Sequence, residues 1–117
     1  MEDLTRRKAL DSYQISPLEV KEKRMQGETF ILLDVREPWE YQTAHLSDSV
    51  LIPLGQLHTR LNELDPEKQI ITLCHHGVRS QTALGILVRG GFKNVKNLTG
   101  GIDAYSLTAD PTIPRYR

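Results

Sequence analysis

The sequence predicts a single α/β domain with a central, mostly parallel sheet flanked by helices on both faces. The chain has 117 residues, which suits one domain with one small core. Strand and helix signals alternate over residues 13–106, as in folds built from strand–helix–strand crossovers. Two continuous apolar runs, TFILLDV and QIITLC, are typical of strands buried on both faces of a parallel sheet.

The first half of the domain begins with a short extended piece over residues 13–15. Ser16 then predicts a helix start, because its side chain can cap a helix in which Pro17 takes the first position and Glu19 completes a capping box. Gly27 ends this helix. The next expected elements are a buried strand at 29–35, a helical turn at 38–43 and a short strand at 49–53.

The second half continues the alternation. Four leucines recur at spacings of three and four and form one apolar stripe, which predicts a helix: Leu54, Leu57, Leu61 and Leu64. This helix is expected to stop near Asp65-Pro66. The strand QIITLC follows. A helix over 80–91 ends at two glycines, and its expected apolar face comprises Ala83, Leu84, Leu87 and Val88. A last strand near 95–98 leads into the glycine turn and brief helix of GGIDAYS.

The two ends are expected to be tails. Residues 1–12 are polar, and residues 107–117 include DPTIPRYR, whose two prolines suit an extended segment on the surface. The domain is therefore expected to span residues 13–106.

Composition excludes several classes of function. Fifteen basic and fifteen acidic residues give a net charge of zero, which argues against nucleic acid or a membrane surface as the partner. The apolar runs are too short to cross a bilayer. The N-terminus has no apolar stretch of secretory type, and the single cysteine suits a reducing compartment, so a cytoplasmic location is expected.

Candidate chemistry gathers at the ends of the two buried strands. Asp34 and Arg36 follow the first strand and Cys74 follows the second. Ligands bind beyond the carboxyl ends of parallel strands, so these side chains are expected to lie close together. Cys74 is followed by a loop and helix start, with the residues His75, His76, Gly77, Val78, Arg79 and Ser80.

The loop favours a reactive cysteine over a merely buried one. Gly77 permits a tight turn, and backbone N–H groups above a helix start can converge on one anion. Such surroundings favour the thiolate, which can attack an electrophilic sulfur. The alternative is that Cys74 is a small buried hydrophobe.

The roles expected of the neighbours differ. His75 and His76 are expected to line the pocket mouth, where protonated imidazoles would attract an anionic donor. The alternative is that they are merely exposed. No metal site is expected, because adjacent side chains diverge. Arg79 would supply charge near the sulfur or form a structural ion pair, and Ser80 would cap the helix. Asp34 and Arg36 are expected to support the loop rather than to take part in catalysis. His45 is expected to have a structural role. Trp39 and Tyr41 are expected to lie in the core.

At these residues the chain resembles the rhodanese family of sulfurtransferases over nearly all of 13–106. Four segments carry the resemblance: LLDVREPWEY, the Tyr41-to-Leu46 segment, the loop CHHGVR, and the stretch from Phe92 to Tyr105 that contains Gly100-Gly101. The chain departs from the family where Leu46-Ser47-Asp48-Ser49 replaces the usual turn and where two histidines follow the cysteine. Related cell-cycle phosphatases carry a loop one residue longer, so the shorter loop favours sulfur over phosphate or arsenate chemistry.

The resemblance implies a thiosulfate sulfurtransferase that uses no metal or organic cofactor. In this reading Cys74 takes a sulfane sulfur from a small donor such as thiosulfate, and passes it through a persulfide to a thiol or protein acceptor. The alternative is a sulfur-relay or docking module for a sulfur carrier or desulfurase, because DPTIPRYR looks like the tail of rhodanese domains fused to adenylating enzymes.

Overall fold

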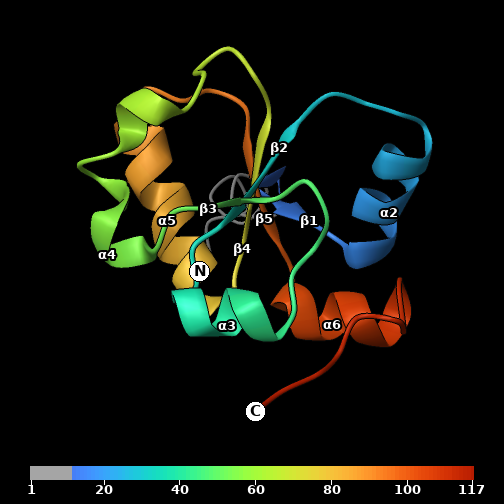
Figure 1. The fold of residues 1–117 in the computed structure, drawn as a ribbon. Coiled ribbons are helices and arrows are strands. Elements are labelled where there is room, and N and C mark those ends of the chain that lie inside the picture. Colours follow the sequence, from blue (N-terminus) through green and yellow to red (C-terminus); the bar gives the residue numbers. More distant parts are fainter. Residues whose placement is uncertain (1–11) are drawn as a thin grey trace, which may run out of the picture.

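The computed structural model describes residues 12–117, in which five parallel strands form one sheet covered by helices on both faces (Figure 1). The sheet order is β1-β5-β4-β2-β3. The strands are β1 (Gln14–Ile15), β2 (Ile31–Asp34), β3 (Val50–Leu51), β4 (Ile70–Leu73) and β5 (Val95–Leu98). The predicted α/β class is confirmed. The expected tail over residues 1–12 lies outside the described residues except for Ser12.

Two pairs of helices cover the sheet. On one face lie α2 (Pro17–Met25) and α6 (Gly101–Thr108), and on the other lie α4 (Leu54–Leu57) and α5 (Val78–Arg89) (Figure 1). The short helix α3 (Pro38–Thr43) lies beside the edge where β4 ends. The predicted start of α2 is confirmed, because Ser16 and Glu19 form a reciprocal capping box. None of the described helices is long and apolar enough to cross a membrane.

The core has one cluster of buried residues on each face of the sheet. Ile71 and Leu73 of β4 point into the cluster under α2 and α6, whereas Ile70 points into the cluster under α4 and α5. Side chains alternate along a strand, and Cys74, the residue after β4, belongs to the second cluster. Strand alternation therefore turns Cys74 toward α5.

The expected single helix over the four leucines is wrong. The chain forms α4 and then a separate 3-10 turn over Leu61–Glu63. α4 ends at Leu57 with His58 as its C-cap. The Thr59 hydroxyl then donates to the Gln56 carbonyl at 3.0 Å, and Arg60, at φ −121°, precedes the separate turn. Leu57 and Leu64 are still buried, because the leucine stripe meets the core through two short turns.

Two further expectations about burial need correction. Val88 is 37% exposed, because the buried face of α5 is formed by Ser80, Ala83, Leu84 and Leu87. The C-terminal segment is not simply a surface tail: α6 continues to Thr108, and Ile113 is 9% exposed and packs in the core cluster under α6. The hydroxyl of Ser106 donates to the Ile113 carbonyl at 2.6 Å and fastens the segment to α6.

Candidate active site

The sheet register brings the two polar strand ends together. Asp34 pairs with Leu73 across β2 and β4, so both strands end at the same level and Cys74 follows immediately. The loop Cys74–Arg79 therefore begins at the carboxyl edge of the sheet and leads into α5. This is the edge at which ligands bind in parallel sheets.

The sulfur of Cys74 receives hydrogen bonds from the loop. The N–H groups of Gly77 and Ser80 donate to Sγ at 3.1 and 3.3 Å, and the Ser80 hydroxyl oxygen lies 3.3 Å from Sγ. The side chain is 1% exposed, yet its sulfur meets polar groups and not only hydrocarbon. Such donors stabilise negative charge on the sulfur.

The helix start offers further donors. The first N–H groups of an α-helix have no partner within the helix. Ser80 gives its N–H to the sulfur, and the N–H groups of Val78 and Arg79 donate to no carbonyl outside α5 among residues 12–117. They are available for an anionic group bound in the loop.

The start of α6 fixes the direction of the loop carbonyls. The N–H groups of Ile102 and Asp103 donate to the carbonyls of Cys74 and His75 at 2.8 and 3.1 Å. Gly101 has φ +66°, and a Cβ there would overlap both carbonyl oxygens. Gly77, at φ +101°, makes the tight turn. With its carbonyls held by α6, the loop turns amides toward the sulfur.

The two histidine rings lie next to each other, tilted by 36°, at the mouth of the loop. The His75 ring lies 4.0 Å from the His76 ring and 4.0 Å from the Tyr116 ring, centroid to centroid. Burial, with a smaller contribution from His76, lowers the pKa of His75, so this imidazole is uncharged at neutral pH. At neutral pH the expected attraction of an anionic donor therefore does not extend to His75. His76 is exposed, and its Nδ1 lies 3.9 Å from an Asp103 oxygen.

Arg79 forms the structural ion pair that was one of its two expected roles. Its guanidinium makes two bonds to the carboxylate of Glu40 on α3, at 2.6 and 2.9 Å. These bonds are the main cause that lowers the pKa of Glu40 to about 2. The loop is thereby tied to α3, while Val78 in the same loop is 77% exposed at its rim.

Asp34 and Arg36 form a fully buried ion pair. Arg36 donates Nη2 to Asp34 Oδ2 at 2.6 Å and Nε to Oδ1 at 2.9 Å, and both side chains are 0% exposed. Nη2 also donates to the Ala44 carbonyl at 2.7 Å, and Nη1 donates to the Tyr116 hydroxyl at 2.9 Å. The pair makes no hydrogen bond to Cys74 in the described structure.

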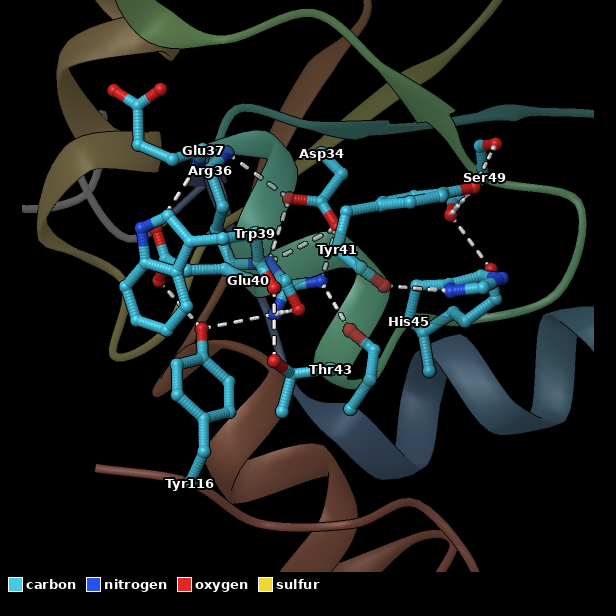
Figure 2. A network of polar contacts seen from close by, with 12 residues as sticks. Asp34, Arg36, Glu37, Trp39, Glu40, Tyr41, Thr43, His45, Ser49 and Tyr116 are labelled. Carbon is cyan, nitrogen blue, oxygen red and sulfur yellow. Dashed lines mark hydrogen bonds and ion pairs between the residues drawn. The ribbon is translucent and has the colours of Figure 1, made fainter.

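Figure 2 shows the network that joins this pair to α3 and to Tyr116. Tyr116 accepts a hydrogen bond from Arg36 and donates one to Glu40 Oε2 at 2.6 Å. Sequence reasoning missed both Glu40 and Tyr116. The EPWEY segment carries a weak signal for Glu40, which accepts from the Glu37 N–H at 3.1 Å as an N-terminal helix carboxylate does. No local signal exists for Tyr116.

The aromatic residues of α3 differ from expectation. Trp39 is 59% exposed, so the expectation of a core position is wrong; its ring meets the edge of Tyr116 at 5.9 Å. Tyr41 is half-buried and stacks on His45 at 4.1 Å. His45 Nδ1 lies 2.9 Å from the Tyr41 carbonyl, on the side of α3 away from Tyr116 (Figure 2).

A fold and loop of this kind define a class of protein. The family model for a rhodanese-like domain matches residues 16–108. The chain therefore belongs to the rhodanese-like family, within the sulfurtransferase superfamily.

Individual relatives agree with this membership. The thiosulfate sulfurtransferase GlpE of Pseudomonas syringae is 33% identical over 81% of this chain and 88% of its own length. The putative sulfur carrier protein YrkF of Bacillus subtilis is 40% identical over 76% of this chain and 48% of that protein. A rhodanese-related protein from Thermoplasma volcanium has a TM-score of 0.77 at 27% identity, over 88% of this chain and 98% of that structure.

The chain spans only part of several relatives. It covers 40%, 26% and 48% of the lengths of the first three curated relatives it matches.

Proposed function

We propose that the chain is a sulfurtransferase in which Cys74 takes a sulfane sulfur from a small donor such as thiosulfate and holds it as a persulfide. One observation carries the proposal: two loop N–H groups and the Ser80 hydroxyl meet the Cys74 sulfur. A relative named as a thiosulfate sulfurtransferase supports the choice of donor.

The transfer has two steps. The Cys74 thiolate attacks the outer sulfur of thiosulfate, a new S–S bond forms, and sulfite leaves with the electron pair of the broken bond. An acceptor thiolate or cyanide then attacks the outer sulfur of the persulfide, and the Cys74 sulfur leaves as a thiolate. Atoms and electrons balance without an added oxidant or reductant, so the reaction requires no cofactor.

The loop residues have separate roles in this scheme. The N–H groups of Gly77 and Ser80 stabilise the thiolate that attacks the donor, and the N–H groups of Val78 and Arg79 are free, in the described structure, to meet the outer sulfur once it is bound. His75 and His76 border the entrance, and Asp34 with Arg36 supports the neighbouring helix. A lone thiol must stay reduced between turnovers, which favours a reducing compartment such as the cytoplasm.

The test is intact-mass measurement after incubation with thiosulfate. We expect one added sulfur atom, lost again when cyanide or a thiol is added and absent in Cys74→Ser. Cys74 is the only cysteine, so the adduct has no other thiol to occupy. An unmutated protein that gains no sulfur from thiosulfate or another sulfane donor would contradict the proposal.

A second function, a sulfur-relay module with little turnover of small molecules, is supported by the relative named as a putative sulfur carrier. Steady-state rates distinguish the two functions. Rapid thiosulfate turnover supports the enzyme, whereas a persulfide that forms but passes only to a protein acceptor supports the relay.

A further inference from the structure

The C-terminal segment returns to the candidate active site through Tyr116. Its hydroxyl lies between two charged groups, accepting from Arg36 at 2.9 Å and donating to Glu40 at 2.6 Å (Figure 2). Its ring stacks on His75 with an interplanar angle of 10°. One side chain therefore contacts α3, the buried Asp34–Arg36 pair and the loop.

The hydroxyl acts on the loop through Glu40. Burial, with the bond to Glu40, raises the pKa of Tyr116 to about 12, so the phenol stays protonated and remains a donor. Glu40 thus receives donors from Tyr116 and from both terminal nitrogens of Arg79. Fixing this carboxylate fixes Arg79, the last residue of the loop.

The ring acts on the loop through His75. The stack helps to bury the imidazole, and His75 Nε2 is buried with no hydrogen-bond partner among residues 12–117. The titratable groups that face His75 are His76 in the loop, Tyr116, Asp103 on α6 and Glu40 on α3. Removing the Tyr116 ring would expose the imidazole and allow it to gain a proton near its ordinary pKa of about 6.5.

We propose that Tyr116 is a positioning residue of the sulfur site, which fixes Arg79 through Glu40 and holds His75 stacked at the loop mouth. The C-terminal segment is then part of the site. The catalytic part of this inference rests on the proposed function, whereas the effect on the loop does not.

The hydroxyl is tested with Tyr116→Phe. Losing a hydrogen bond to a charged partner should lower kcat/KM for sulfur transfer about tenfold, and most of this loss should disappear when Glu40→Gln is already present. Tyr41→Phe is the matched control, because that tyrosine also stacks on a histidine and donates its hydroxyl, to the Ser49 carbonyl at 3.2 Å. Equal losses in both variants, or full additivity with Glu40→Gln, would overturn the role through Glu40.

The ring is tested without sulfur chemistry, by alkylating Cys74 with neutral iodoacetamide and with anionic iodoacetate from mildly acidic to mildly basic pH. In Tyr116→Ala the rate ratio should shift several-fold toward iodoacetate below about pH 6.5, where the uncovered His75 becomes cationic. Tyr116→Phe keeps the stack and should keep the ratio of the unmutated protein.

The outcomes separate the two proposals. An unchanged alkylation ratio in Tyr116→Ala, with the thermal unfolding midpoint showing a folded protein, would overturn the positioning of His75. A shifted ratio in a protein that never forms a persulfide would reject the proposed function and leave the positioning of His75 standing.

Discussion

At the residue scale, Glu40 is a buried carboxylate that depends on its donors. It is 4% exposed and accepts from both terminal nitrogens of Arg79 and from the Tyr116 hydroxyl. An acid buried without such partners would resist ionisation, whereas this one has its pKa lowered to about 2. The charge of Glu40 is therefore part of how the loop is held.

This carboxylate predicts a pH dependence of stability. Because the folded pKa of Glu40, about 2, lies below the ordinary value of 4.5, its contribution is present above about pH 4.5 and is lost as pH falls toward 2. Glu40→Gln should lower the free energy of unfolding at neutral pH by at most about 3 kcal/mol, and the deficit should shrink in acid. Urea unfolding at several pH values measures it.

The control for this prediction is Glu63→Gln. Glu63 is also paired with an arginine, Arg60, but on the exposed surface. Its removal should change stability little at any pH, because exposed ion pairs are screened by water. A deficit of Glu40→Gln that is independent of pH would contradict the assigned role.

At the scale of elements, the start of α6 holds the loop that begins after β4. Two N–H groups of α6 donate hydrogen bonds to the carbonyls of Cys74 and His75. The two carbonyls lie so close to Gly101 that a Cβ at this position would overlap them. Gly101, the first residue of α6, is therefore explained by a contact with a distant loop as well as by a turn.

Gly101→Ala should distort the loop and destabilise the fold. The matched control is Gly27→Ala, because Gly27 has a similar φ, +71°, but open space around it. The control should cost about 1 kcal/mol from left-handed backbone alone. Thermal and urea unfolding should show a several-fold larger loss for Gly101→Ala, together with loss of persulfide formation. Equal losses would show that the contact with the carbonyls has no energetic weight.

At the scale of the whole molecule, the C-terminal segment joins the core to the site. Ile113 packs in the cluster under α2 and α6, and Tyr116, three residues later, reaches the loop on the carboxyl edge. Because Ile113 is packed in the core and bonded to Ser106, we expect it to hold the segment that places Tyr116.

Ile113→Ala is therefore expected to affect stability and activity together. Removing this buried side chain should cost about 2 to 4 kcal/mol in unfolding free energy. It should also reduce sulfur transfer under conditions where the protein remains folded, because Tyr116 is less firmly held. Leu107→Ala, at a side chain that is 59% exposed, is the control. Unchanged activity in a destabilised Ile113→Ala protein would separate the segment from the site.

Patterns confined to a few neighbouring residues were predictable. The capping box at Ser16 and the strand Val95–Leu98 are present as expected, because capping and strand burial depend on residues close in sequence. The leucine stripe correctly indicated which side chains face the core. It did not indicate that the helix is interrupted, because Thr59 and Arg60 lie between α4 and the 3-10 turn that follows.

The sequence alone determined the order of the elements, the parallel sheet and the loop that surrounds Cys74, because each follows from local periodicity, caps and turns. Only the tertiary structure decided that Arg79 pairs with Glu40, that Trp39 is exposed and that Tyr116 covers His75. The Arg79–Glu40 contact joins residues 39 positions apart. Such pairs meet only when the whole chain folds, and no periodic pattern in the sequence indicates them.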